Sequence, residues 1–166
     1  MRFPDPKLSF EQQDDLILFA MCLYGEARNQ SDLAVTGAGC AVRNRVQDTA
    51  KRNGDGWKQV ILKPWAFSSF NPGDPNRSKL VCPLKHDAPC VWERCLRIAS
   101  ALYNGGQPDI TNGATHYYDT SLVKPPNWAR FYPFTLQLGA FRFHRQTPAG
   151  DQAAAVWRRQ AGSHTR

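Results

Sequence analysis

Residues 16–28 read Leu-Ile-Leu-Phe-Ala-Met-Cys-Leu-Tyr-Gly-Glu-Ala-Arg, and this stretch decides the fold. Residues 16–24 are all apolar or aromatic, and Glu26 follows within the same predicted helix. With 100° between successive residues, Glu26 lies about 20° from Phe19 and about 40° from Cys22 around the helix axis. Apolar side chains also occupy the opposite side, which is typical of a central buried helix. We therefore expect the Glu26 carboxylate to project from a hydrophobic surface.

The expected burial of Glu26 has a chemical consequence. A carboxyl group in apolar surroundings has a raised pKa, because burial disfavours its charged form. Such a group can protonate a glycosidic oxygen at neutral pH as a general acid. The alternative is a structural glutamate that pairs with a buried arginine. The other two glutamates, Glu11 and Glu93, lie in the first turns of predicted helices, where the helix dipole favours them. Glu26 has no comparable structural explanation, which favours the functional interpretation.

The size and charge of the chain restrict its class. Its 166 residues suit one domain with its own core. The 21 basic and 14 acidic residues give a formal net charge of +7, which favours an anionic partner such as nucleic acid, a membrane surface or a bacterial envelope. The basic residues are scattered and no nucleic-acid-binding motif occurs, so we expect no nucleic acid partner and a monomer. A nucleic-acid-binding domain and a non-catalytic glycan-binding module remain the alternatives of another class.

The sequence shows no visible targeting segment. Residues 1–6 contain no apolar core or small-residue cleavage site of a signal peptide. The apolar run at 16–24 is shorter than the ~20 residues that span a bilayer. We therefore expect synthesis in the cytoplasm without a signal peptide, and any action outside it would require release by another component.

Five cysteines occur, and three of them lie close together with a histidine. Cys22 and Cys40 fall in apolar helical stretches and are predicted to be small core residues. The remaining group has the spacing C-x3-H-x3-C-x4-C, which matches none of the usual zinc patterns, so we expect no metal and no cofactor. A disulfide between the first two cysteines of the group is a second alternative, and free thiols are favoured over both. This group consists of Cys82, His86, Cys90 and Cys95.

Three helices are predicted, at residues 10–27, 32–48 and 89–104. The first follows a capping box formed by the sequence Ser-Phe-Glu-Gln at 9–12. Gly25 costs about 1 kcal/mol relative to alanine in a helix interior. We therefore expect it to mark the helix end or a close approach by a ligand.

Other segments have weaker patterns. The small residues at 37–42 should let another helix pack closely, and 49–88 is expected to be mostly loop. Within that loop, the aromatic and hydroxyl residues at 65–70 serve either a function or a small satellite core. Residues 112–119 are predicted to form a β segment. Residues 152–166 contain arginines but no acid, which indicates a basic tail with a short helix at its start.

Five short blocks, in order, resemble the SleB-like cell wall hydrolases, a family that includes spore cortex-lytic enzymes and phage endolysins. Residues 24–28 match its Y-G-E-A-R motif, and residues 42–46 resemble its V-x-N-R-V helix. Phe67-Ser68 resembles its Q-F-S loop, although Ala66 stands where glutamine is usual. The last two blocks are Gly113-Ala114-Thr115-His116-Tyr117-Tyr118 and Trp128-Ala129-Arg130.

This resemblance implies an α+β fold: a mostly helical, lysozyme-like single domain, similar to lytic transglycosylases, with a small β part beside a glycan cleft. It implies a catalytic domain over residues 1–150, followed by the basic tail at 151–166. Glu26 would be the general acid and base at the β-1,4 bond between N-acetylmuramic acid and N-acetylglucosamine in peptidoglycan. Aromatic and hydroxyl side chains suit sugar rings and their OH groups. The expected substrate-binding residues are Phe67, Ser68, Ser69, Thr115, His116, Tyr117, Tyr118 and Trp128.

The chain departs from the family pattern at two positions. The family often has glutamate where Gln30 stands, and histidine where Phe141 stands. Most glycoside hydrolases use two carboxylates. Here Asp109 or Asp119 is a candidate for the second, although a loop aspartate is more often a turn former. With Glu26 alone, the resemblance favours a lytic transglycosylase that forms a 1,6-anhydro end, and a hydrolytic muramidase is the alternative.

The implied biological setting is a phage or prophage endolysin. The single-domain size and the lack of a visible export signal favour it over a secreted housekeeping enzyme. A basic lysin would be attracted to the anionic lipids and polymers of the envelope.

Overall fold

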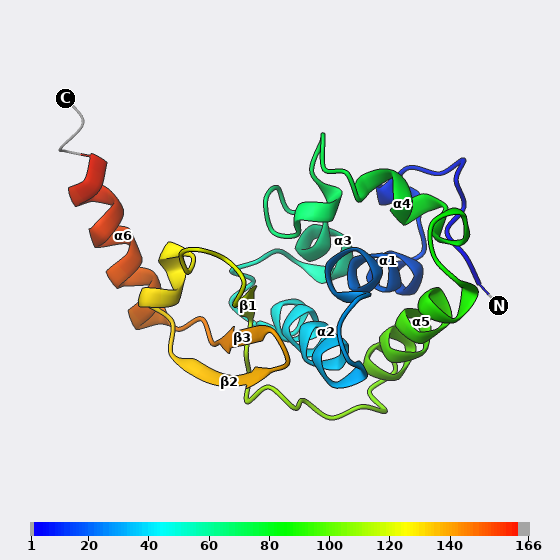
Figure 1. The fold of residues 1–166 in the computed structure, drawn as a ribbon. Helices are drawn as coiled ribbons and strands as arrows, with labels where there is room; N and C mark the ends of the chain where they lie inside the picture. Colours follow the sequence, from blue (N-terminus) through cyan, green and yellow to red (C-terminus); the bar gives the residue numbers. More distant parts are fainter. Residues whose placement is uncertain (1, 163–166) are drawn as a thin grey trace.

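The computed structural model describes residues 2–162 and has the predicted α+β architecture, with a helical body and a small sheet (Figure 1). The α-helices are α1 (Asp15–Ala27), α2 (Asp32–Val46), α3 (Gly56–Ile61), α4 (Arg77–Val81), α5 (Pro89–Tyr103) and α6 (Pro148–Gly162). Four 3-10 turns lie at Phe10–Gln12, Ser68–Phe70, Pro83–Lys85 and Asn127–Arg130. The strands are β1 (His116–Asp119), β2 (Phe134–Leu138) and β3 (Phe141–His144).

Helix α1 is the centre of the helical body, as its sequence predicts. It contacts α2, α3, α4 and α5, and Figure 1 shows it among them. All residues from Ile17 to Tyr24 are buried. A helix that is apolar on every side must be covered on every side, and the four neighbours provide this cover.

The start of α1 differs from the prediction. A 3-10 turn occupies Phe10–Gln12, and α1 begins only at Asp15, because Gln13 is extended. The Gln13 side chain is buried, and its Nε2 donates to the backbone oxygen of Asp5 at 2.7 Å. Asp14 then caps α1 by accepting from the backbone amide of Leu16 at 3.0 Å. A side chain that binds backbone elsewhere in the fold has interrupted the expected continuous helix.

The glycines of α2 bring two elements close, as expected for a run of small residues. A Cβ on Gly39 would collide with Leu102 of α5. A Cβ on Gly37 would lie 2.7 Å from Leu138 Cδ1 and 2.9 Å from Phe143 Cζ, both in the sheet. Helix α2 therefore joins the helical body to the sheet.

Residues 49–88 contain more helix than predicted. Besides loops they form α3, α4 and two 3-10 turns. Each piece is short, because proline and glycine residues recur along this segment. Val60 and Ile61 of α3 are fully buried, so tertiary packing stabilises a helix that is too short to be stable alone.

The sheet has three antiparallel strands in the order β1-β3-β2. Tyr117 is paired with Phe143, and Leu138 with Phe141. The predicted β segment at 112–119 is confirmed only for its second half, since β1 begins at His116.

Helix α6 is longer than the short helix expected at the start of the tail. It begins at Pro148, before the expected boundary at residue 150, and continues to Gly162. Tyr132 Oη donates to Asp151 Oδ1 at 2.7 Å, and the rings of Phe131 and Trp157 are 6.0 Å apart. Figure 1 shows the helix extending from the sheet side of the molecule. The final four residues of the predicted tail, 163–166, lie outside the described residues.

The five cysteines are free thiols, which confirms the favoured alternative and not the disulfide. Cys22 and Cys40 are buried in the core, as predicted. Between residues 2 and 162, no group of three or more His, Cys, Asp or Glu side chains is placed to hold a metal ion. None of the helices in the same range is long and apolar enough to cross a membrane.

Candidate active site

Glu26 lies in the last turn of α1, where the segment at 65–70 crosses the helix. Its Oε1 accepts two hydrogen bonds from Ser69, one from Oγ at 2.8 Å and one from the backbone amide at 3.2 Å. Ser69 itself is fully buried. The carboxylate is therefore held at one oxygen by two donors from a residue 43 positions away in the sequence.

Gly25 makes this contact possible. A Cβ at this position would lie 2.5 Å from Ser69 Oγ and 2.9 Å from Leu80 Cδ2. Gly25 lies in the last turn of α1, near the predicted helix end, and the group that approaches it in this structure is the chain's own Ser69. Glycine destabilises a helix, but only a residue without a side chain lets Ser69 lie this close to α1 and bind Glu26.

Burial raises the pKa of Glu26, as expected from its apolar surroundings. The two Ser69 hydrogen bonds oppose this effect, since they favour the charged form. The Asp74 carboxylate raises the pKa of Glu26 further, and the Arg45 guanidinium lowers it. The net effect is a raised pKa, which suits the Glu26 carboxyl group to donate a proton.

Arg45 is the main site residue that the sequence interpretation did not select. It lies on α2, is only 7% exposed, and its Nε donates to the backbone oxygen of Thr115. Its guanidinium lies over the Phe67 ring, 4.9 Å from the centroid. The available signal was the position of Arg45 within the V-R-N-R-V block, between buried apolar residues of a helix.

Two of the predicted binding residues are buried and contact other residues of the site. Phe67 is 3% exposed and lies under Arg45, and Ser69 is covered and bound to Glu26. Of the three predicted binding residues in this loop, only Ser68 is exposed. The contact of Phe67 and Ser69 with a substrate, expected from the sequence, is therefore replaced in this structure by contact with Arg45 and Glu26.

Strand β1 divides its residues between two sides of the sheet, because side chains alternate along a strand. Tyr117 packs against Phe141 and Phe143, with ring centroids 5.0 and 5.6 Å away. Its Oη is buried and has no hydrogen-bond partner within residues 2–162. Burial, followed by the charge of Glu26, raises the pKa of Tyr117 well above its usual value, so this hydroxyl is a neutral donor beside the carboxyl group.

The other side of β1 carries an aromatic cluster. His116 lies 5.1 Å from Trp128, and Tyr118 lies 5.9 Å from the same ring. The sequence interpretation missed two members of this cluster, Tyr132 and His144, because neither belongs to a recognised block. His144 Nδ1 and the Tyr132 backbone oxygen are 2.7 Å apart.

His116 is uncharged in this cluster. Burial, followed by the nearby Arg45 charge, lowers the pKa of His116 to about 2. Its Nδ1 lies 3.0 Å from Thr115 Oγ1, which in turn accepts from the Gln146 amide at 2.8 Å. Thr115 and His116 therefore belong to one hydrogen-bonded unit at the start of β1.

A pocket of about 470 Å³ brings several of these residues together. It lies between the segment at 63–66, strand β1 and helix α6, so three regions distant in sequence form its walls. Its cationic and aromatic lining residues include Arg45, Lys63, Arg158, Trp65, Tyr117 and Trp128. Glu26 does not line this pocket, but two of the lining residues interact with it electrostatically: Arg45 lowers the pKa of Glu26, and the charge of Glu26 raises the pKa of Tyr117.

Both candidates for a second carboxylate are hydrogen-bonded to backbone amides of their own loops. Asp109 accepts from the Thr111 amide at 2.9 Å and the Gly113 amide at 2.7 Å. Asp119 accepts from the Ser121 amide at 2.8 Å. Both form turns, as the general behaviour of loop aspartates indicates. The acidic residue whose charge acts on Glu26 is Asp74, which sequence analysis did not single out.

Comparisons with known proteins show the family and the fold of this chain. A family model described as Cell Wall Hydrolase matches residues 30–144, more than half of the chain. This chain belongs to the cell wall hydrolase family. The match includes Arg45, Ser69, Tyr117 and Trp128, and it begins four residues after Glu26. The predicted family is thereby confirmed, and with it an enzyme that acts on the bacterial cell wall.

Two solved structures have the same fold. The catalytic domain of the germination-specific lytic transglycosylase SleB from Bacillus anthracis aligns with a TM-score of 0.62 and 21% identity, covering 81% of this chain and 96% of that chain. The catalytic domain of the Bacillus cereus SleB protein aligns with a TM-score of 0.57 and 20% identity, covering 87% and 98%. No curated protein matches the chain. These likenesses confirm the predicted lysozyme-like α+β fold.

Proposed function

We propose that this enzyme is a lytic transglycosylase that cleaves the β-1,4 bond between N-acetylmuramic acid and N-acetylglucosamine, with Glu26 as its acid and base. The observation that carries the proposal is the buried Glu26 carboxyl group with its raised pKa, held by Ser69. The SleB domain with the same fold bears the description of a lytic transglycosylase.

The reaction needs one carboxyl group. Protonated Glu26 gives its proton to the bridging oxygen as the bond from that oxygen to C1 of the muramic acid breaks. The resulting Glu26 carboxylate then takes the proton of the muramic acid 6-hydroxyl, whose oxygen forms the new bond to C1. No water is consumed, and Glu26 recovers its proton. The two Ser69 donors stabilise the carboxylate between these steps and fix its orientation.

The neighbouring groups support both steps. Arg45 is buried beside Glu26 and stabilises its charged form, while the unpartnered Tyr117 hydroxyl is free to donate to a substrate oxygen. The remaining predicted binding residues are Ser68, Thr115, His116, Tyr118 and Trp128. All five are at least partly exposed, and they offer hydroxyl groups and aromatic faces to sugars.

A hydrolytic muramidase is the second candidate, because Asp74 acts on Glu26 electrostatically. A muramidase would use such a second carboxylate to activate water or to attack C1. Asp74 Oδ1 accepts from the Asn76 amide at 2.8 Å, which is the arrangement of a turn, so the one-carboxylate reaction is favoured.

The experiment is mass spectrometry of fragments released from purified peptidoglycan by the wild type, Glu26→Gln and Asp74→Asn. A lytic transglycosylase releases anhydro fragments, each lighter by one water than the hydrolysed equivalent. We expect anhydro fragments from the wild type and from Asp74→Asn, and none from Glu26→Gln. Reducible muramic ends that disappear in Asp74→Asn would establish the muramidase instead. Full activity of Glu26→Gln would overturn the assignment of the acid.

The net charge of +7 fits a cell-wall setting, since the envelope is rich in anionic polymers. Release to the wall as a phage-type endolysin is part of the same proposal. Lysis by enzyme added from outside, compared with expression in the presence and absence of a separate membrane-permeabilising protein, tests this route.

A further inference from the structure

The pocket lined by Arg45 and Tyr117 is more basic than a site for neutral sugars requires. Three of its lining residues, Arg45, Lys63 and Arg158, are cations, and none of the described residues that line it is acidic. Within residues 2–162, no ion pair joins any of the three to a carboxylate. Other basic residues nearby do form ion pairs with carboxylates. In the neighbouring cavity of about 540 Å³, Lys51 lies 2.5 Å from Asp55 and Lys58 lies 3.8 Å from Asp15.

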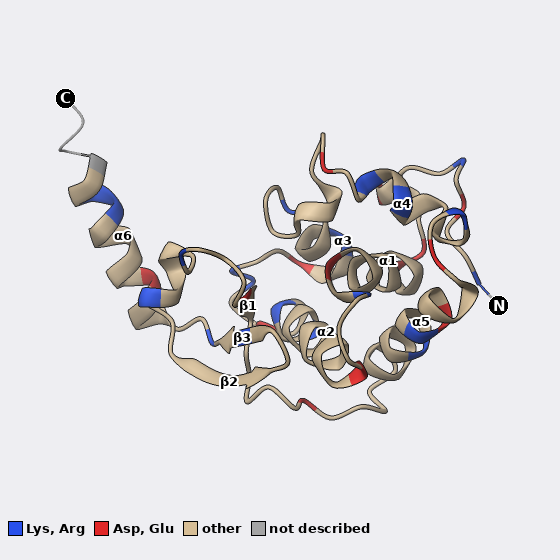
Figure 2. Cartoon of the chain, viewed as in Figure 1, with Lys and Arg blue, Asp and Glu red and all other residues tan. Residues whose placement is uncertain are grey.

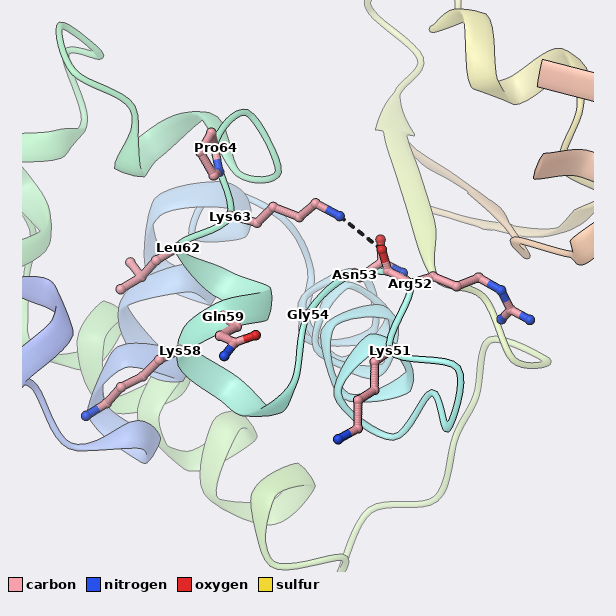
Figure 3. A pocket seen from close by; sticks show the side chains of 9 residues that line it. All are labelled: Lys51, Arg52, Asn53, Gly54, Lys58, Gln59, Leu62, Lys63 and Pro64. Carbon is pink, nitrogen blue, oxygen red and sulfur yellow. Dashed lines mark hydrogen bonds between the residues drawn. The ribbon is translucent and has the colours of Figure 1, made fainter. Parts of the chain in front are cut away.

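Lys63 lies on the wall between the two cavities, and Figure 3 shows it from the neighbouring one. Its side chain extends toward Arg52, and Nζ donates to the Arg52 backbone oxygen at 3.0 Å. An ammonium group has three donors, so this bond leaves two for another acceptor. The charge of Lys63 also acts on His116 in the pocket. This places a partly coordinated cation beside β1.

Arg158 reaches the pocket because α6 is docked on the sheet side. Asp151 and Trp157 anchor the helix to the segment at 131–132. Figure 2 shows basic residues on the part of α6 beyond this anchor, and Figure 1 shows α3 and α6 on either side of β1. Arg158, which was predicted to belong to a basic tail, therefore lines the pocket.

The aromatic residues of the pocket are suited to bind a sugar ring. Trp65 is 82% exposed and has a φ of 65°, a left-handed conformation that is costly for a bulky residue. Its backbone amide donates to Asn71 Oδ1 at 3.2 Å, which helps to hold this conformation. An indole kept in solvent at the rim, with Trp128 in the same pocket, offers flat faces for a sugar ring.

We propose that this pocket is a subsite for muramic acid that reads a carboxylate on its 3-O substituent, through Lys63 and Arg158. The inference rests on the proposed peptidoglycan substrate and deepens it. A carboxylate is the group that separates this sugar from its N-acetylglucosamine neighbour, and paired cations bind it with charge-assisted hydrogen bonds. The carboxylate comes either from the stem peptide or, where the peptide has been removed, from the lactyl group itself.

The test compares glycan strands with free carboxylates and the same strands with those carboxylates converted to amides. Binding is measured by calorimetry in a Glu26→Gln background, and turnover is measured in the otherwise wild-type enzyme. We expect amidation to weaken binding about tenfold, as for the loss of one charge-assisted contact. Lys63→Met and Arg158→Met should each weaken binding of carboxylate strands and reduce the preference for them.

The matched control is Lys51→Met, which removes the same charge from the neighbouring cavity and should keep the full preference. Equal binding of both strand types by the Glu26→Gln protein would overturn the subsite, and so would an equal loss of preference in Lys51→Met. Strands with peptides and strands stripped by an amidase distinguish the two carboxylate sources. Because binding is measured without turnover, an enzyme that releases no fragments would refute the proposed function and leave the subsite result valid.

Discussion

Gly25→Ala tests the contact on which the candidate active site depends. The added methyl group would lie 2.5 Å from Ser69 Oγ and 2.7 Å from Ser69 Cβ, about 1 Å inside the 3.4–4 Å of ordinary contact. The same methyl group would also lie only 2.9 Å from Leu80 Cδ2. Ser69 must therefore move away from α1, and its hydrogen bonds to Glu26 must lengthen or break.

The stability change is expected to be small. Overpacking a core costs about 1–3 kcal/mol. Alanine regains about 1 kcal/mol over glycine in a helix interior. The free energy of unfolding should therefore fall by about 0–2 kcal/mol, which urea denaturation measures.

The activity change is expected to be much larger. A displacement of about 1 Å at a reacting group costs on the order of 100-fold in rate. We expect fragment release from peptidoglycan to fall by about this factor. Gly37→Ala is the matched control, since its methyl group would meet Leu138 at 2.7 Å in the same kind of helix position but away from Glu26. It should lose similar stability and keep its activity.

Two results would refute this reasoning. Full activity in Gly25→Ala would mean that the Ser69 contact has no part in the reaction. Equal loss of activity in both glycine variants would mean that general destabilisation, and not the position of Ser69, causes the loss.

Three further predictions concern the same region. Ser69→Ala removes a hydrogen bond that lowers the pKa of Glu26, so the alkaline limb of kcat/KM should move to higher pH; a shift to lower pH would contradict the role of an acid. The pKa of Glu26 is raised above its ordinary value of 4.5 in the folded state, so ionisation destabilises the fold as pH rises above 4.5. Glu26→Gln should then raise the free energy of unfolding at pH 7 by about 1 kcal/mol, and urea denaturation at low pH should show this gain disappear. Arg28→Met breaks the ion pair of 3.2 Å with partly buried Asp87 and should lower thermal stability by about 2 kcal/mol, whereas an unchanged Tm would show that solvent screens the pair.

Sequence patterns determined the three helices α1, α2 and α5. The apolar run of α1, the small residues of α2 and the helical spacing of α5 are local signals, and all three helices lie close to their expected positions. The beginning of α1 was wrong by five residues, since Gln13 binds Asp5 and ends the preceding turn. Boundaries depend on such individual contacts, whereas the existence of a long helix depends on its whole pattern.

The candidate acid, Glu26, could also be predicted from the sequence. A glutamate on an apolar helix has a raised pKa wherever that helix is buried, so the character of Glu26 follows from local spacing. The residues that contact Glu26 or act on its charge could not be predicted in this way. Ser69 and Arg45 reach the site from a short turn and from another helix, and neither position follows from the residues around it.

Only the tertiary structure decided how the pocket is formed. Strand β1 pairs with β3, and α6 then docks on Tyr132, so that Arg158 and Lys63 face one pocket although 95 positions separate them in the sequence. Local patterns act over a few residues and specify which face of an element is apolar. The meeting of distant charged groups depends on how all the apolar faces pack together, which no single segment specifies.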